Sequence, residues 1–533
     1  MYRTLMHAGI KRCLKGCFVL LGCFFLHQLN ANAAPALDQP FTVMQPDGTI
    51  IVAKSRGDEW LNWTENAAGF PIAQAPDNYW YIVQSFVGNK PILSGIRADA
   101  PIVPSVMQKV RPTSSLSRSI SLHPQLAAGP AAAKAGPVGR FADRVLFILV
   151  EFKNQRHKTP PQAWARKLRE IRNYYRTVSY KNVSLAPARE TFGKRNDGIV
   201  GWLKLPMNHP NTRNNTGLKN QLLAKKAILA ANRYVNFAAY DKNRDGYVDS
   251  NELAVVIIAA GYEAAYANIP RSVWGHAWAI SRPPKVDGVT VGAYWNGLLG
   301  YAQFGELHGT RKVNHQATLG IMVHELGHLI FAWPDLYDYD NSSSGIGAFG
   351  LMSAGNWGMK AQDKWAGQTP VSPTGWSKLQ RGWVKPGATT KGRKRLVAAG
   401  ARTANKFNTV LKLGVSASGK EYFVVENRQD QGYDRGFERW FGPRFKGGLV
   451  IYHVDDNMTS NTNDRHRWVD VEEADGTPMG RTLGSLTDMW STNSSTTFNG
   501  QTNPNSNYYN GTPSGVSISN ISAPKTNMTL RLN

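Results

Sequence analysis

The chain has 533 residues and carries 62 Lys and Arg against 37 Asp and Glu, a formal net charge of +25. This length exceeds what one compact core accommodates, so we expect two or three domains. No nucleic-acid-binding motif is present, and no segment after the first residues is apolar over the roughly 20 positions that a membrane span needs. The basic residues are dispersed, so their excess is compatible with contact to a polyanionic surface or with an ordinary solvated surface.

The first 33 residues have the pattern of a secretory signal peptide. Basic residues precede the apolar run CFVLLGCFFL (17–26), and the small residues Ala-Asn-Ala at 31–33 suit a cleavage site. The alternative, a lipoprotein processing box at LLGC (20–23), is opposed by the apolar FFL that follows Cys23. All three cysteines lie in this segment, so the exported chain would have neither a disulfide nor a cysteine metal ligand. We therefore expect a secreted, extracellular protein.

Composition divides the rest of the chain into four parts. Residues 34–97 have the short apolar runs and turns of a small β-rich module. Residues 98–140 are rich in Pro, Ser, Ala and Gly, and the basic residues among them would be open to proteolysis in an exposed linker. Residues 141–390 mix helical and strand patterns, and 391–533 alternate short β-like runs with Gly, Asn and Ser loops, which predicts a β-rich, sandwich-like domain. This order is that of a zymogen, with 34–97 as its pro-module.

The spacing of apolar residues predicts the elements of the 141–390 domain. RVLFILVEFK (144–153) is typical of a buried strand, and 161–179 is predicted to be a helix. A second helix is expected over 216–235. The run LAVVIIAAGYEAA (253–265) is continuous and rich in β-branched residues, which favours a central strand. The helical spacing in 161–179 is carried by Trp164, Leu168, Ile171 and Tyr175.

The stretch DKNRDGYVDSNE (241–252) has the ligand spacing of an EF-hand calcium loop. Oxygen ligands at alternate positions suit a hard cation, and Gly246 falls at the sharp turn. The alternative is an Asp/Asn/Gly turn held by its own side chains, which the strand-like sequence after the loop supports. The expected calcium ligands are Asp241, Asn243, Asp245, Tyr247 through its backbone carbonyl, Asp249 and Glu252.

The stretch MVHELGHLIFAWPDLYDYD (322–340) sets two histidines four residues apart around a glutamate. On a helix, His324 and His328 lie on one face one turn apart and can present two nitrogens to one metal ion. Glu325 lies beside them and can take a proton from a metal-bound water, while zinc acidifies that water and polarises a carbonyl oxygen. The alternative is an amphipathic helix that happens to carry two imidazoles.

A catalytic zinc generally has three protein ligands and an open position for water. Pro334 is expected to stop the helix, so that Asp335 can turn back toward the metal. Asp338 is the reserve candidate in the same turn, and Glu306 is a third and weaker choice.

Several motifs resemble the immune inhibitor A family of secreted bacterial metallopeptidases, within the metzincin group. VHELGH, PDLYD and LMSAGNW carry the resemblance around the two histidines. The similarity extends over most of the chain from about residue 40, in family order, through GDEW, ETFGKRNDGIVGW, DKNRDGYVD, VWGHAW, GWSKLQRGWV, EYFVVENRQ and YHVDD.

The resemblance implies an α+β fold, with a metzincin-like catalytic domain that contains a mixed sheet and an active-site helix. It implies that His324 and His328 bind zinc, that Glu325 is the general base, and that Met352 lies in a tight turn beneath the metal. The sequence departs from the family at one point. Metzincins commonly place Gly three residues after the second histidine and the third ligand three further on, but Phe331 and Pro334 stand there, so Asp335 falls one residue late.

Together these features predict a monomeric secreted zinc endopeptidase, made as a zymogen, that hydrolyses peptide bonds of extracellular proteins. Without a cysteine, a pro-module that blocks the zinc would use a carboxylate, a backbone carbonyl or steric cover. The alternative is a secreted protein that binds surface polymers through its β-rich end and carries a vestigial peptidase domain; the intact Glu325 argues against it. Two weaker groups are the aromatic cluster Trp274, His276 and Trp278, and a second possible calcium site at Asp455, Asp456, Glu473, Asp475 and Asp488.

Overall fold

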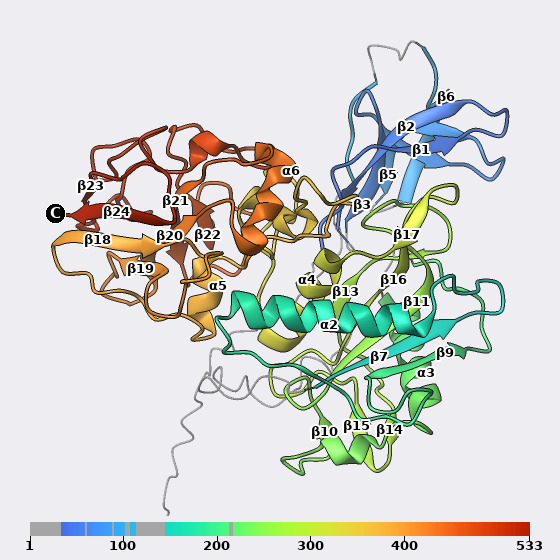
Figure 1. Ribbon diagram of the computed structural model, residues 1–533. Helices are drawn as coiled ribbons and strands as arrows, with labels where there is room; N and C mark the ends of the chain where they lie inside the picture. The colour runs from blue at the N-terminus through green and yellow to red at the C-terminus, as the bar shows by residue number, and fades with distance from the viewer. Residues whose placement is uncertain (1–33, 59–60, 88–89, 102–106, 113–143, 213–216) are drawn as a thin grey trace, which may run out of the picture.

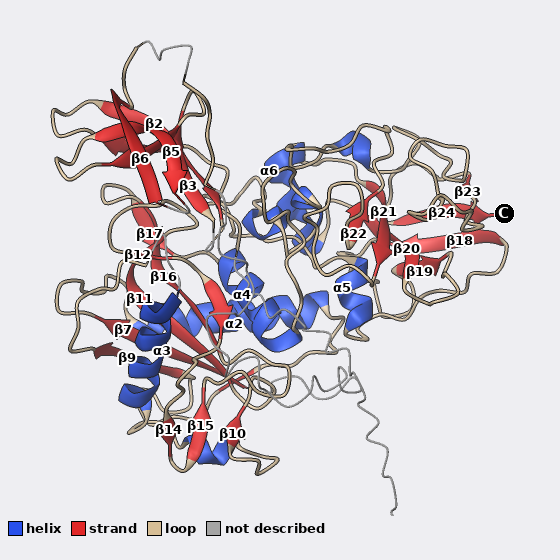
Figure 2. Ribbon diagram, turned by 180° about the vertical axis from the view of Figure 1, so that it is seen from behind, coloured by secondary structure: helices blue, strands red, loops and turns tan. Residues whose placement is uncertain are grey.

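The computed structural model describes residues 34–533 except 59–60, 88–89, 102–106, 113–143 and 213–216. These residues form a mixed α/β structure with several sheets and few helices, arranged in three parts (Figure 1). The N-terminal sheet and the C-terminal sheets both lie against a central domain, and helix α4 of that domain lies where the three parts meet (Figure 2). The predicted signal peptide at 1–33 and most of the predicted linker lie outside the described residues.

The N-terminal part is one six-stranded antiparallel sheet in which each strand pairs with the next along the chain. Alternate residues of its second strand are buried, as expected for a sheet with one face on a core. Residues 34–97 therefore contain the β-rich structure that their sequence predicts. The strands are β1 Phe41–Met44, β2 Ile50–Gly57, β3 Asn62–Asn66, β4 Pro71–Gln74, β5 Trp80–Val87 and β6 Lys90–Arg97.

The central domain is built on an eight-stranded sheet. Its three middle strands, β7 Arg144–Glu151, β11 Ala254–Glu263 and β16 Tyr301–Gly309, are parallel, and β11 is buried along its whole length. Both of the predicted strands in this region are therefore present. The sheet is completed by β8 Ala186–Pro187, β9 Ile199–Lys204, β12 Ser272–Val273, β13 His276–Trp278 and β17 Asn314–Gln316.

Helices cover both faces of this sheet. Phe147 and Leu149 of β7 share one core with α2 Pro161–Val178 and α4 Leu319–Phe331. The alternate residues of the same strand face a second core with α3 Gly217–Ala231. The period-2 pattern of β7 thus separates two helical layers. The predicted helix at 216–235 ends four residues early, at Ala231, where a turn follows. The four apolar residues that predict α2 are all buried: Trp164, Leu168, Ile171 and Tyr175.

A small sheet and several short elements complete the central domain. Strands β10 Tyr247–Val248, β15 Val289–Val291 and β14 Lys285–Val286 form a three-stranded sheet beside the predicted calcium loop. The short helical segments are η1 Phe237–Tyr240, η2 Gly347–Phe349, η3 Ala354–Trp357 and α5 Gly375–Gln380.

The C-terminal part has a three-stranded and a four-stranded sheet whose apolar residues share one core, which agrees with the expected β-rich domain. Arg428 of this part is fully buried and pairs with Glu426 at 2.9 Å and Asp434 at 2.7 Å. The same guanidinium donates to the carbonyl of Phe349 at 3.0 Å, so it links the C-terminal sheets to the segment beneath α4. The elements are β18 Gly392–Val397, β19 Val410–Leu413, β20 Glu421–Arg428, η4 Gly432–Phe437, α6 Glu438–Phe441, β21 Gly448–Asp455, β22 Val469–Val471, η5 Leu486–Asp488, β23 Ile518–Ser519 and β24 Asn527–Leu532.

Within the described residues, none of the helices combines the length and the apolar character that crossing a bilayer requires.

Candidate metal centre

Apart from His324, Glu325 and His328, helix α4 consists of apolar residues and glycines, and all of its residues are buried. A helix of this kind is stable only inside a core, and here it packs between α2 and the central sheet. The helix ends at Phe331, three residues before Pro334, because Ala332 adopts the left-handed conformation with φ of 46°. The stop therefore comes from a left-handed cap rather than from the proline. This turn sends the chain back toward the helix.

Three side chains converge after this turn. His324 Nε2 lies 3.0 Å from Asp335 Oδ1 and 3.0 Å from His328 Nε2. His328 Nε2 lies 3.1 Å from the same carboxylate oxygen. In the described part of the chain this is the one group of three or more His, Cys, Asp or Glu residues whose ligand atoms all lie within 4.8 Å of one another. The helix places the two histidines together, and the turn at Ala332 adds the carboxylate.

The outer ring nitrogens determine which atoms face this centre. His324 Nδ1 lies 3.0 Å from the carbonyl of Leu351, and His328 Nδ1 lies 2.5 Å from the carbonyl of Trp333. Carbonyl oxygens only accept, so each Nδ1 carries a hydrogen and each Nε2 of the neutral ring presents a lone pair inward. A single proton can lie between only two of the three inward atoms, whereas a divalent cation interacts favourably with all three.

The carboxylate of Asp335 fits the same interpretation. It is fully buried, and its Oδ2 has no hydrogen-bond partner among the described residues. Burial alone would raise the pKa of Asp335, but the two imidazoles beside it hold that pKa below its usual value. Two imidazole nitrogens and one carboxylate oxygen form a donor set that suits zinc. The residues present therefore fit the metal that the sequence predicts.

Glu325 lies beside this group and is also fully buried. Its Oε1 accepts a hydrogen bond from the backbone N–H of Ala34 at 2.9 Å, and its Oε2 has no partner among the described residues. Burial raises the pKa of Glu325 well above its usual value, and the nearby Asp335 and Glu263 raise it further. The carboxyl is thus held in an environment that favours a bound proton.

The residues Ala34–Leu37, named here the N-terminal segment, lie across the site. The indole of Trp274 donates to the carbonyl of Ala34 at 3.1 Å, and that of Trp357 donates to the carbonyl of Pro35 at 2.9 Å. The backbone N–H of Leu37 donates to the carbonyl of Ala265 at 2.7 Å. A cavity of about 240 Å³ remains beside the segment. The sequence did not indicate that these residues reach Glu325, which is 291 positions away.

Met352 lies directly beneath α4. A β-carbon added to Gly327 would lie 2.8 Å from the sulfur of Met352 and 3.1 Å from the ring of Trp333, so a larger residue would displace Met352. The backbone carbonyl of Met352 accepts from the N–H of Leu336, which ties this turn to the segment that carries Asp335. Met352 and Trp333 thus occupy the space beside Gly327.

The other predicted zinc ligands lie elsewhere. Asp338 is engaged by its own loop, where its oxygens accept from the N–H of Asp340 at 3.1 Å and of Ser343 at 2.8 Å. Burial raises its pKa to about 6. Glu306 accepts from the backbone N–H and the hydroxyl of Thr159 and does not belong to the group of three. Among the candidates, Asp335 is therefore the carboxylate that the structure brings to the histidines.

The predicted calcium loop is held by its own backbone. Asp241 accepts from the N–H of Asp245 at 3.1 Å and of Gly246 at 3.0 Å, and Glu252 reaches back to the N–H of Lys242 at 2.7 Å. Burial and the nearby Asp245 raise the pKa of Asp249. The strand β11 follows this loop, in place of an exit helix. The acidic side chains thus gather in one loop, but they do not form a group with ligand atoms within 4.8 Å.

The aromatic cluster and the suggested second calcium site do not form sites of their own among the described residues. Trp274 contacts the N-terminal segment, whereas His276 is a core residue that bonds to the carbonyl of Trp274 and to the hydroxyl of Tyr301. Burial lowers the pKa of His276 to about 4. The acidic residues of the suggested second calcium site bond mainly to nearby backbone and side-chain donors and form no group of three ligands within the described residues.

Glu263, at the end of β11, is a site residue that the sequence analysis missed. Its fully buried carboxylate accepts backbone N–H groups of Ala265 at 3.1 Å, Gly275 at 2.8 Å and Gly305 at 2.9 Å. It thereby holds Ala265, whose carbonyl accepts from Leu37, and Gly275, which follows the Trp274 that donates to Ala34. A glutamate at the end of an otherwise apolar strand was the available signal. Burial raises its pKa to about 7.

We expect Glu263→Ala to lower the free energy of unfolding by about 3 kcal/mol or more, because each buried donor left without a partner costs about 1–3 kcal/mol. Glu263→Gln, which keeps one acceptor oxygen, should cost less. The pKa of Glu263 in the folded state lies above the ordinary value of 4.5, so the stabilising proton is lost as pH rises through about 7. The stability difference between Glu263→Gln and the parent should therefore shift in favour of the variant as pH rises from 4.5 to 7. Urea unfolding of parent and variants across this range tests both statements, and a pH-independent difference would contradict the second.

Comparison of the sequence with protein-family models and with curated proteins gives no match. The interpretation of this site therefore rests on its own geometry.

Proposed function

We propose that the protein is a zinc-dependent endopeptidase whose active site is formed by α4 and the turn that follows it. The observation that carries this proposal is the convergence of His324 Nε2, His328 Nε2 and Asp335 Oδ1 beside the buried carboxyl of Glu325. These three residues would hold the metal. When bound, zinc supplies Lewis acidity for a water and for the carbonyl oxygen of the scissile bond.

The chain's own residues would move the proton. Glu325 lies on the same helix as both histidines, and it would accept a proton from the attacking water and return it to the leaving amine. The Nδ1 hydrogen bonds to the carbonyls of Leu351 and Trp333 would keep both imidazoles in one tautomer and orientation.

We further propose that the fold is metzincin-like and that the protein is related to the immune inhibitor A family. The proposal is supported by the buried α4 helix, the turn that returns Asp335, and Met352 packed under Gly327. The additional residue before Asp335 would be accommodated by the left-handed Ala332, which redirects the chain immediately after the helix.

The described form would be latent. The N-terminal segment fills the space beside Glu325 and occupies one of its carboxylate oxygens. If the exported chain begins at Ala34, the backbone nitrogen of Ala34 would be an α-amino group. Its positive charge would then pair with the carboxylate of Glu325. The N-terminal segment would then block the active site through its backbone and by steric cover. No cysteine could serve this purpose, because all three cysteines precede Ala34. Secretion, processing in the linker, protein substrates and a monomeric state belong to the same proposal.

The third ligand provides a sharp test of the metal proposal. In the processed protein, Asp335→Ala should weaken zinc binding by more than about 100-fold, since loss of an outer partner of a ligand already costs about 10–100-fold. The matched control is Asp338→Ala, three residues away and buried in the same turn region, which should bind zinc as the parent does. Zinc content after dialysis against a graded chelator measures both. Equal zinc retention by the two variants would show that Asp335 is not a ligand. Loss of zinc in the Asp338 variant alone would make Asp338 the third ligand in place of Asp335.

We also propose that the loop 241–252 binds one structural calcium ion, since its side-chain oxygens stand at the spacing of a calcium loop. Calcium at 100 times its dissociation constant should raise the free energy of unfolding by about 2.7 kcal/mol. Asp241→Asn should abolish this increase, whereas the control Asp77→Asn, at an exposed turn of the N-terminal sheet, should keep it. Thermal unfolding with EGTA and with added calcium makes the measurement. An unchanged melting temperature in the parent would refute the calcium site.

A further inference from the structure

A second feature of the central domain is a basic groove at the carboxyl end of α2. The groove has a volume of about 510 Å³ and is lined by residues of α2 and of the loop that follows it. We propose that this groove binds a polysaccharide that carries sulfate or phosphate groups. The lining residues are Arg169, Arg172, Asn173, Arg176, Lys181, Val183, Ser184 and Leu185.

The helical repeat creates the basic side of the groove. Residues 169, 172, 173 and 176 are spaced i, i+3, i+4 and i+7, so they lie on one face of α2. Lys181 extends this face beyond the helix, where Tyr180 and Lys181 both adopt left-handed conformations with φ of 53° and 69°. The guanidinium of Arg172 is held in place by a hydrogen bond from Nε to the carbonyl of Leu185 at 2.6 Å. On this side of the groove, the guanidinium of Arg172 therefore has a fixed position.

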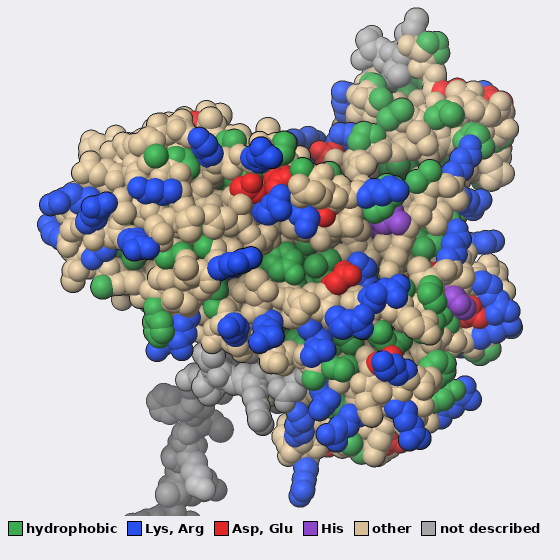
Figure 3. Space-filling view, in the orientation of Figure 1, with side chains coloured by type: hydrophobic (Ala, Val, Ile, Leu, Met, Phe, Trp, Pro, Cys, Tyr) green, Lys and Arg blue, Asp and Glu red, His purple; other side chains and the backbone are tan. Residues whose placement is uncertain are grey.

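No carboxylate of the described residues forms an ion pair with these four cations. Glu170, their acidic neighbour on α2, pairs instead with Lys167 at 2.6 Å. The space-filling view shows Lys and Arg side chains grouped over the face that α2 presents (Figure 3). One or two cations near a helix carboxyl end would be explained by the helix dipole, but that effect falls off within the last turn and does not account for Arg169.

The longest undescribed stretch after the predicted signal is basic rather than acidic. Residues 113–143 contain Arg118, Lys134 and Arg140 against the single acidic residue Asp143. Removal of the predicted signal leaves 58 basic and 37 acidic residues in the chain. Charge complementarity therefore points to an anion from outside the molecule.

The lining distinguishes between classes of polyanion. Arginine forks bind sulfate and phosphate oxygens in pairs, and the side chains of Asn173 and Ser184 can exchange hydrogen bonds with sugar hydroxyls. The groove has no aromatic side chain on which the bases of a single-stranded nucleic acid could stack. Val183 and Leu185 are buried, so no exposed apolar side chain is available there for insertion into a membrane. These features favour a charged polysaccharide.

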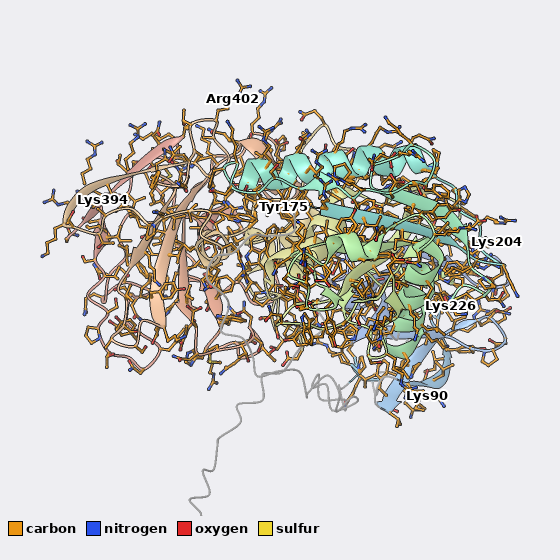
Figure 4. All side chains as sticks on the ribbon, turned by 90° about the horizontal axis from the view of Figure 1, so that it is seen from below. Lys90, Tyr175, Lys204, Lys226, Lys394 and Arg402 are labelled. Atoms are coloured by element: carbon orange, nitrogen blue, oxygen red, sulfur yellow. The ribbon has the colours of Figure 1, made fainter. Side chains whose placement is uncertain are left out.

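The test compares two double variants with the same change in net charge. Arg169→Glu with Arg176→Glu alters the groove and leaves Arg172 in place. Lys204→Glu with Lys226→Glu is the control, and Figure 4 shows these two lysines at the opposite end of the central domain from the Tyr175 end of α2. Binding of the full chain to heparin, to phosphomannan, to polyglutamate and to duplex DNA is measured at several salt concentrations. Melting temperatures verify folding, and Arg169→Gln with Arg176→Gln replaces the charge reversal if that variant is unstable.

We expect the groove variant to bind heparin or phosphomannan at least about tenfold more weakly near 0.15 M salt and with a reduced salt slope, while the control stays within about twofold. The polysaccharide that binds more tightly identifies sulfate or phosphate as the preferred group. Equal losses in both variants, or no binding of either polysaccharide, would overturn the proposal. Tighter groove-dependent binding of polyglutamate or DNA would overturn the assignment to a polysaccharide.

Discussion

Replacing Glu325 with Gln in the processed protein is expected to lower the rate of casein hydrolysis by about 10³-fold, within the range of about 10²–10⁴ that a positioned acid–base group supplies. The zinc content should stay at one per chain, because His324, His328 and Asp335 are unchanged. Glutamine has nearly the shape of glutamate but cannot take up and return the proton. Zinc analysis and initial rates on the same preparations make the comparison.

Glu170→Gln serves as the matched control for this substitution, since that glutamate lies on the exposed side of α2 and pairs only with Lys167. Its rate should equal that of the parent. If Glu325→Gln retained full activity with bound zinc, the assignment of the general base would be wrong. If the parent bound no zinc and cleaved no casein, the alternative of a secreted binding protein would replace the peptidase proposal.

Full-length protein that retains the N-terminal segment is expected to be at least about 100-fold less active than processed protein, if the open form is populated at about one part in a hundred. The physical reason is the set of backbone contacts that hold Ala34 and Leu37 against Glu325 and Ala265. Deletion of residues 34–37 from the otherwise full-length chain should restore much of this activity. The hydrogen bonds to Glu325 and Ala265 come from these residues and not from the strands of the N-terminal sheet.

Casein hydrolysis by the full-length, deleted and processed forms, with cleavage of each followed by mass spectrometry, separates these effects. Equal activity of the full-length and processed forms would end the zymogen proposal. A deletion that stays inactive until the linker is cut would transfer the inhibitory role from the N-terminal segment to the sheet β1–β6.

The elements of the central domain could be predicted from the sequence because their patterns are local. Trp164, Leu168 and Ile171 repeat with the period of a helix, and the continuous apolar run of β11 matches a strand buried on both faces. The pairing of His324 with His328 follows from the same geometry, since positions i and i+4 of a helix lie on one face. The end of a helix is less local: a proline was expected to stop α4, but Ala332 in a left-handed cap ends it earlier.

Tertiary structure decided the rest of the candidate site. The choice between Asp335 and Asp338 depended on the direction of the chain after Ala332, and spacing cannot supply that direction. The approach of Ala34 to Glu325 joins residues 291 positions apart, and the bonds of Glu263 join three segments that only the folded sheet brings together. The sequence by itself therefore determined which residues carry metal-ligand and acid–base groups, and that three of them, His324, Glu325 and His328, lie on one helix. The fold decided which carboxylate completes the group and what covers it, because contacts between distant segments depend on packing rather than on periodicity.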